Sequence, residues 1–429
     1  MITSSILETT YPLSFRKNDA KSLGQQIKNR RSVVLIGMKR VGISNFLRFF
    51  LYHKDILKTY INDDKNHLFI PIDLNDLVER EVYPFWVLTQ KRILDSVEKA
   101  NISEKNKKYI ETLFLDSIQS QDLFLTIDSI RKSLVMLSEL NFVPTLFYLR
   151  FDRMKEASTP DFFSNLQGLV DATHGTLSYV FTSVRSLDNL SPTVFSKSSV
   201  SVFAQNIYIK PVEKEDAKII FRAGGNTKLK ISPSLEKKLM DLVDGYVQYI
   251  HFSIAYLFEK KNIDNLENLF ENLVMDERIV LQSEELWESL EQNEQEILIK
   301  HIGGEKISKE EKQKAEYIYN TGFIENNEIF SPLFKYYLRE KEKELKRETQ
   351  KVEFSKKENS LLKLLKEKEN NVCEREEIIE SVWPEVEALG VSDWAIDRLV
   401  ARLRVKLKLQ QSNFEIITVK TRGYKLIEN

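Results

Sequence analysis

The stretch from Ser32 to Leu57, SVVLIGMKRVGISNFLRFFLYHKDIL, decides the fold class of the first half of the chain. SVVLIG is a short apolar run typical of a buried β-strand, and SNFLRFFLYHKDIL has the apolar spacing of a helix. Between them, GMKRVGIS has two glycines five positions apart and a terminal hydroxyl, which is the spacing of a phosphate-binding loop. A strand, a glycine loop and a helix in this order predict the first unit of an α/β domain.

A phosphate-binding loop works through inward-pointing backbone N–H groups, a helix N-terminus, a lysine that reaches the outer phosphates and a hydroxyl that ligates magnesium. Here Ile43 stands at the lysine position and carries no charge. Two interpretations stay open. The loop either keeps only its shape, or it still holds ATP or ADP without hydrolysis, with Lys39 or Arg40 supplying positive charge. The candidate nucleotide-binding residues are Gly37, Lys39, Arg40, Gly42 and Ser44.

Composition excludes several classes of function. The 429 residues carry a formal net charge of −1, so charge has to be read region by region. One cysteine, Cys373, and five scattered histidines indicate neither a disulfide nor a metal site, and no catalytic set of side chains stands out. Because we find neither a leader pattern nor an apolar stretch of membrane-spanning length, we expect a cytoplasmic protein without a membrane partner.

Three further apolar runs, HLFIPIDL, PTLFYLRF and LSYVFTSV, are separated by enough chain for one or more helices each. This order predicts a mainly parallel sheet covered by helices. After it, helical periodicity continues to about residue 280. Helices and the sequence FIENNEIF, with Asn326 and Asn327 at a turn, then predict a winged helix.

The ordering of the first 340 residues resembles the AAA+/STAND class of P-loop NTPases, in which the corresponding strand often ends in DEFDRL. The counterpart here is LFYLRFDRMKEA. In one register Leu149 and Arg150 replace the magnesium-holding aspartate and the catalytic glutamate; in the other, Asp152 is the metal ligand and Arg153 replaces the base. Both registers lose the glutamate that would activate water, so the resemblance implies a degenerate module without ATPase activity.

Near the end of the chain, SDWAIDRLVARLRVKLKL predicts a helix capped by Ser392. Ile396, Leu399 or Val400, Leu403 and Leu407 share its apolar face. Between residues 398 and 425, eight basic residues stand against the single acid Glu415, a net charge of +7. Such segregation is the electrostatic pattern of a nucleic-acid binder.

Residues 354–429 resemble the OmpR/PhoB-type winged-helix effector domain of bacterial response regulators. Four blocks carry the resemblance: Glu358 with Leu361 and Leu362, REEIIESVW, DRLVARLRVKL and IITVKTRGYKL. It implies double-stranded DNA as a partner, with base readout from the helix and backbone contacts from the wing.

Thr421 stands where the family usually has glycine, and Trp394 is either a packing residue or a groove contact. The candidate DNA-binding residues are Trp394, Ala395, Arg398, Arg402, Arg404, Lys406, Lys420 and Arg422.

Together these patterns predict a multi-domain chain of α/β and α+β folds. We expect a degenerate P-loop NTPase-like domain at 1–205, a helical lid at 206–280, a winged helix for interactions at 281–340, a charged linker at 341–353 and an OmpR/PhoB-type winged helix-turn-helix at 354–429. The leading hypothesis is a sequence-specific DNA-binding transcriptional regulator, in which the STAND-like module acts as a sensor or as a scaffold without hydrolysing ATP. The alternatives are an active ATP-dependent switch and an interaction scaffold that does not bind DNA. A protein partner or self-association would use residues 1–340.

Overall fold

A computed structural model of the chain divides into two compact units, residues 1–219 and 220–429. The residues that it describes are 6–195, 204–225, 231–259, 268–348, 354–384, 391–409, 412–419 and 422–428. No helix within these ranges is long and apolar enough to cross a membrane.

The first unit is built on a five-stranded sheet in the order β2-β3-β4-β1-β5, and all its pairings are parallel. The strands are β1 Val33–Ile36, β2 Asn66–Asp73, β3 Phe142–Leu149, β4 Ser178–Ser183 and β5 Gln205–Tyr208. The predicted parallel sheet and its first four strands are confirmed. The strand β5 was not predicted, because this edge strand begins with two exposed polar residues and contains no apolar run.

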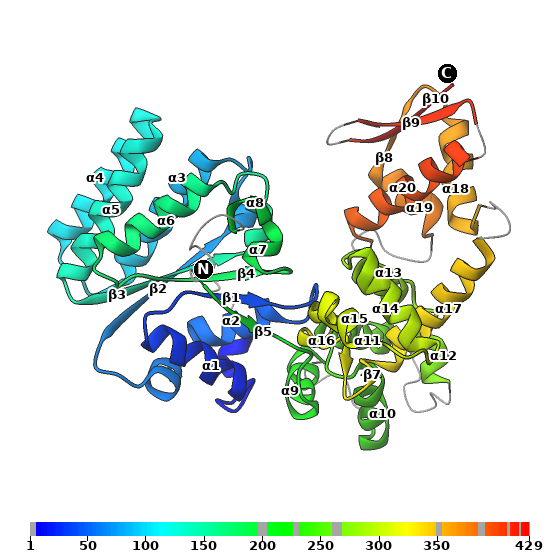
Figure 1. The fold of residues 1–429 in the computed structure, drawn as a ribbon, viewed down its shortest axis with the longest axis horizontal. Coiled ribbons are helices and arrows are strands. Elements are labelled where there is room, and N and C mark those ends of the chain that lie inside the picture. The colour runs from blue at the N-terminus through cyan, green and yellow to red at the C-terminus, as the bar shows by residue number, and fades with distance from the viewer. Residues whose placement is uncertain are drawn as a thin grey trace. The chain divides into compact units, whose positions relative to one another are not determined.

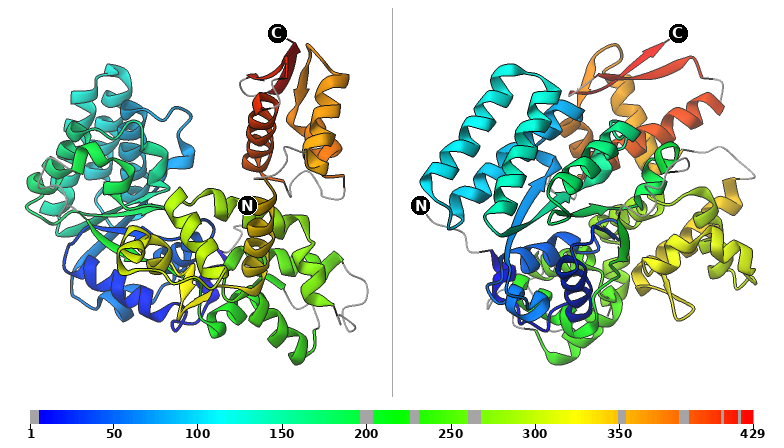
Figure 2. Two further views of the ribbon diagram at one scale, coloured as in Figure 1. Left: turned by 45° about the vertical axis from the view of Figure 1, so that its right-hand side comes forward. Right: turned by 60° about the vertical axis from the view of Figure 1, so that its left-hand side comes forward.

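Helices cover both faces of this sheet, with α1 and α2 on one face and α3 to α6 on the other (Figures 1 and 2). Buried aromatic rings fill the space beneath α3 to α6, including Tyr148 and Phe181, which stack with centroids 5.7 Å apart. The helices of this unit are α1 Lys17–Lys28, α2 Ile43–Tyr52, α3 Val82–Lys99, α4 Glu104–Ser120, α5 Leu123–Glu139, α6 Pro160–Ala172, α7 Leu187–Leu190 and α8 Pro192–Phe195, with single turns η1 Leu7–Thr10, η2 Leu57–Ile61, η3 Leu74–Asp76 and η4 Phe151–Met154.

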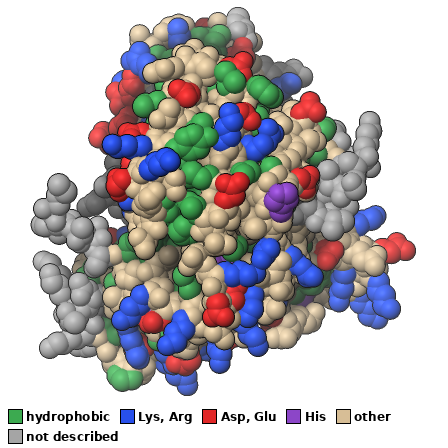
Figure 3. Space-filling model, turned by 90° about the vertical axis from the view of Figure 1, so that its left-hand side faces the viewer, with side chains coloured by type: hydrophobic (Ala, Val, Ile, Leu, Met, Phe, Trp, Pro, Cys, Tyr) green, Lys and Arg blue, Asp and Glu red, His purple; other side chains and the backbone are tan. Residues whose placement is uncertain are grey.

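The surface carries charges of both signs. On the face drawn in Figure 3, lysines and arginines lie among aspartates and glutamates. This mixture agrees with the near-zero formal charge of the whole chain. Any strongly one-signed surface must therefore be local.

The second unit begins within α9 Lys214–Gly225 and is mainly helical up to α17. A two-stranded hairpin, β6 Ile324–Glu325 and β7 Glu328–Ile329, turns at Asn326 and Asn327, both with positive φ. This confirms the hairpin predicted from FIENNEIF. The helices are α10 Pro233–Val243, α11 Val247–Glu259, α12 Leu269–Val274, α13 Glu277–Glu288, α14 Gln292–Ile302, α15 Lys309–Lys314, α16 Glu316–Asn320 and α17 Pro332–Glu348.

The final segment of this unit packs three helices against a three-stranded antiparallel sheet in the order β8-β10-β9 (Figure 1). The elements are α18 Lys356–Glu367, β8 Val372–Glu374, α19 Arg375–Val382, α20 Asp393–Leu409, β9 Phe414–Val419 and β10 Gly423–Glu428. The long helix α20 follows α19 and precedes the β9–β10 hairpin. This arrangement is a winged helix, as predicted.

Candidate phosphate loop and nucleic-acid interface

The loop between β1 and α2 requires glycine at two positions. A Cβ atom on Gly37 would lie 2.8 Å from the carbonyl oxygen of Ile209, which follows β5. Gly42 adopts φ 107°, a conformation that other residues rarely take. Arg40 between them also has positive φ, at 58°. The sequence pattern thus identified a loop whose turns require these glycines.

The protein's own side chains support this loop from inside. Met38 and Val41 are buried, and Ile43 Cδ1 lies 3.3 Å from where a Cβ on Gly37 would be. Arg16 is also buried, and its guanidinium donates to the carbonyl oxygens of Val41 (3.3 Å) and Lys210 (3.0 Å). Apolar packing and the hydrogen bonds of Arg16 therefore both support the loop shape.

The predicted nucleotide-binding side chains come from this one loop and the start of α2. Lys39 is half-buried, whereas Arg40 and Ser44 are exposed. Ser44 lies in the first turn of α2, where a hydroxyl would be placed to hold a metal beside a phosphate. Whether a nucleotide binds here stays a prediction.

Arg150 occupies the carboxyl edge of the sheet, immediately after β3, with φ 60°. Its backbone N–H donates to Thr182 Oγ1 at 2.7 Å, and its guanidinium forms an ion pair with Asp73, the last residue of β2. Asp73 is directly opposite Leu149 in the strand register. Arg150 therefore places a positive charge at the edge where the resemblance expects acids that support metal and water.

Asp152 follows Arg150 in the single turn η4. Burial raises the pKa of this carboxyl, and its own backbone N–H and the charges of Lys39, Arg150 and Arg153 only partly offset that effect. Among the described residues, no group of three or more His, Cys, Asp or Glu side chains is placed to hold a metal.

In the second unit, α20 presents an apolar face to the core of the winged helix. Ile396, Leu399, Val400, Leu403 and Leu407 are all buried, as predicted. At the start of the helix, the backbone N–H of Ala395 donates to Ser392 Oγ at 3.3 Å, which confirms the predicted cap.

Of the two predicted DNA-binding residues at the start of α20, Ala395 lies differently from expectation and Trp394 lies as in one of its two alternatives. Ala395 is only 2% exposed and belongs to the core cluster, so its side chain is not on the charged face. The reason is helical spacing, because Ala395 lies four residues before Leu399. Trp394 is partly buried and packs against the same cluster, as in the packing alternative.

Arg404 joins α20 to the wing. Its guanidinium donates to the carbonyl oxygen of Ile416 at 2.8 Å and to Thr418 Oγ1 at 2.9 Å, and it lies 5.8 Å from the centre of the Tyr424 ring. The Tyr424 hydroxyl in turn donates to Asp397, and burial together with Asp397 raises the pKa of Tyr424 to about 12. These contacts fix the angle between helix and wing.

Arg398, Arg402 and Lys406 recur every four residues along the face of α20 away from the domain core. Lys406 donates to the buried carboxylate of Glu358 at 2.9 Å. Arg398 is paired with Glu288 at 2.6 Å, and Arg402 with Glu284, both on α13.

The protonation states of this face follow from the same pairs. Burial opposes the charge of Arg402, but Glu284 and Glu358 outweigh it and raise the pKa of Arg402. Burial alone would raise the pKa of Glu358, but hydrogen bonds from Ser355 and Lys406 outweigh it and lower the value. Both shifts favour the charged forms of Arg402 and Glu358.

The wing carries the remaining predicted residues. Arg422 is 61% exposed, and its Nε donates to Glu374 Oε1 at 2.9 Å. Lys420, and Thr421 beside it, lie outside the described residues.

Sequence reasoning missed several charged partners that matter at both sites. Asp73 could have been found from its position at the end of an apolar strand, but nothing local indicated that Arg150 would pair with it. Glu284 and Glu288 lie 118 and 110 residues before their arginine partners, so no sequence pattern connects them. Arg16 carried no recognisable signal.

Comparison with known proteins agrees with this geometry. Residues 349–426 match the family model described as "Transcriptional regulatory protein, C terminal". No curated protein was found to match the sequence.

Among solved structures, the Walker-type ATPase PABY2304 of Pyrococcus abyssi is similar at 17% identity and a TM-score of 0.50, covering 78% of this chain and 99% of that one. The Aeropyrum pernix ORC2 protein in its ADP form is similar at 11% identity and a TM-score of 0.43, covering 78% of this chain and 88% of that one. The fold assignment rests on the first of these. The first unit thus has a parallel-sheet fold similar to that of a Walker-type ATPase. Residues 349–426 form a winged-helix domain of the OmpR/PhoB type found in transcriptional regulatory proteins.

Proposed function

We propose that this protein is a transcriptional regulator that recognises specific duplex DNA through α20 and the β9–β10 wing. The carrying observation is the position of Arg398 and Arg402 on the face of α20 opposite the core of a winged helix. In such domains the second helix of the helix-turn-helix, here α20, enters the major groove. There, arginine pairs with the O6 and N7 atoms of guanine. Arg422 on the exposed wing is suited to the DNA backbone.

We further propose that the ATPase-like unit is a sensory or scaffold module that does not hydrolyse ATP. Ile43 supplies no charge, and Arg150 with its partner Asp73 occupies the sheet edge where a catalytic acid would stand. ATP or ADP bound without turnover is compatible with this role. A protein partner or self-association through residues 1–340 is the route by which a signal would reach the chain.

The DNA proposal is tested by sequencing genomic fragments retained by the purified full chain, followed by anisotropy titration on the recovered site. We expect one enriched motif and an affinity that falls steeply as salt rises, because phosphate contacts release counterions. Replacing Arg398 and Arg402 by alanine should weaken binding about 5- to 150-fold for each, from about 1–3 kcal/mol per base contact.

The matched control removes two exposed lysines from α18 of the same domain, as Lys356→Ala with Lys363→Ala. It changes net charge equally but should weaken specific binding far less. Unchanged binding after loss of both arginines would favour the interaction-scaffold alternative. Absence of any enriched motif would overturn sequence-specific recognition.

A steady-state phosphate-release assay tests the absence of hydrolysis. We expect wild type and Ser44→Ala to release phosphate at the same background rate, because neither has a lysine at position 43 or a catalytic glutamate. The double variant Ile43→Lys, Arg150→Glu restores both charges and serves as the gain-of-function comparison. Turnover in wild type that Ser44→Ala abolishes would instead establish an active switch.

A further inference from the structure

Four side chains form one stripe along α13: Glu277, Leu281, Glu284 and Glu288. Their spacing of four, three and four residues places them on a single helix face. We call this set the α13 stripe. Glu284 and Glu288 are largely covered, with side chains 11% and 16% exposed, although carboxylates usually lie in water.

Each member of the α13 stripe contacts the winged-helix domain. Glu277 pairs with Lys357 of α18, and Leu281, 7% exposed, belongs to the buried apolar cluster of that domain. Glu284 pairs with Arg402, and Glu288 with Arg398. One apolar anchor and three carboxylates are therefore complementary to α18 and α20.

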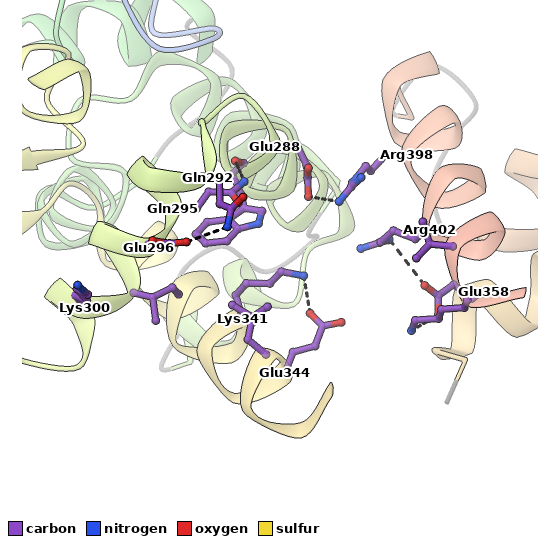
Figure 4. A pocket seen from close by; sticks show the side chains of 15 residues that line it. Glu288, Gln292, Gln295, Glu296, Lys300, Lys341, Glu344, Glu358, Arg398 and Arg402 are labelled. Atoms are coloured by element: carbon purple, nitrogen blue, oxygen red, sulfur yellow. Dashed lines mark hydrogen bonds and ion pairs between the residues drawn. The ribbon is translucent and has the colours of Figure 1, made fainter. Parts of the chain in front are cut away.

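The α13 stripe pairs with Arg398 and Arg402, the two arginines that the proposed DNA recognition requires. A carboxylate and the O6 and N7 atoms of guanine are both acceptors for a guanidinium, so they compete for the same N–H donors. In Figure 4, Arg398 points toward Glu288 while Arg402 extends between the helices. While these pairs exist, neither arginine can reach a base edge.

Two features of the contact between α13 and α20 reduce its stability. The Nε atoms of Arg398 and Arg402 are buried without a hydrogen-bond partner. Beside the pairs lies a cavity of about 850 Å³, lined by residues that include Trp287, Lys341 and Val405. Unsatisfied donors and incomplete packing weaken a contact, so an opposing ligand such as DNA can displace it.

We propose that the α13 stripe is an intramolecular acidic surface that masks the DNA-reading face of α20, so that DNA and α13 compete for Arg398 and Arg402. This inference rests on the proposed function and adds its regulation. A signal that moves α13 would unmask the helix and raise DNA affinity, whereas a signal that strengthens the contact would lower it.

The test compares DNA affinities of three full-length proteins on one selected duplex: wild type, Glu284→Gln with Glu288→Gln, and the control Glu305→Gln with Glu310→Gln. Glutamine keeps the shape but removes the charge, and the control removes two exposed acids from the same unit. We expect at least tenfold tighter binding by the stripe variant and less than a twofold change in the control.

Hydrogen exchange of α20 in the absence of DNA gives a second readout, with circular dichroism to verify folding. Release of α13 should speed exchange in α20 of the stripe variant only. Equal DNA affinity of wild type and stripe variant, or equal exchange, would overturn masking while leaving DNA binding intact. If none of the three proteins binds any duplex, the proposed function itself fails.

Discussion

Gly423→Ala should unfold the wing and abolish specific DNA binding. A Cβ atom at this position would lie 2.0 Å from the carbonyl oxygen of Cys373, which is far inside van der Waals contact. The obstacle is backbone rather than a flexible side chain, so β10 must separate from β8. That separation breaks the pairings Gly423–Glu374 and Tyr424–Cys373, at a cost of about 3 kcal/mol or more.

The effect should reach α20, because β10 carries Tyr424 and the Tyr424 hydroxyl holds Asp397 of that helix. Thermal unfolding and hydrogen exchange of β8 and β10 are the measurements, followed by titration of DNA. Gly168→Ala is the matched control, since nothing lies within 4 Å of its new Cβ and α6 gains a better helix former. An unfolding midpoint equal to that of wild type in Gly423→Ala would contradict the close strand approach.

Glu358→Ala should produce the second largest loss. This buried carboxylate accepts from the Ser355 backbone N–H in a capping box and from Lys406 Nζ at 2.9 Å. Its removal ends both interactions and leaves the Lys406 ammonium, 16% exposed, without that partner. We expect the free energy of unfolding of the winged helix to fall by about 2–3 kcal/mol.

Comparison with Glu358→Gln separates the two contributions, because glutamine can keep the capping box but not the ion pair. The folded-state pKa of Glu358 is lowered, so its stabilisation is present above the ordinary carboxyl pKa and is lost as pH falls through the folded-state value. Wild type should therefore lose stability in that acidic window and Glu358→Gln should lose less. Parallel pH profiles for the two proteins would rule out the ion-pair contribution.

Much of the fold was predictable because it depends on local patterns. Apolar runs identified four strands, the Asn326–Asn327 turn identified a hairpin, and period 3.6 identified the buried face of α20. Two features were not predicted correctly, the edge strand β5 and the buried position of Ala395. The edge strand β5 is short and polar at its start, and Ala395 belonged to the apolar spacing but was assigned to the charged face.

The electrostatics of both candidate sites were much less predictable. An ion pair between distant segments forms only where the tertiary fold brings them together. Neither charge pattern nor residue spacing in the sequence predicts that contact. Arg150 could be recognised as an anomaly after a strand, but its partner Asp73 is 77 residues away. In the same way, α20 could be recognised as basic, but not that carboxylates of α13 cover it.

The Arg150–Asp73 pair also bears on which substitutions the N-terminal unit tolerates. Replacing Arg150 by glutamate alone would set two carboxylates against each other at the carboxyl edge of the sheet, which is unfavourable unless a cation arrives with them. Restoring lysine at Ile43 alone would bring a new charge to a loop that apolar side chains already support. Each single substitution is therefore penalised unless the other accompanies it, so the effects of the two changes should not be additive.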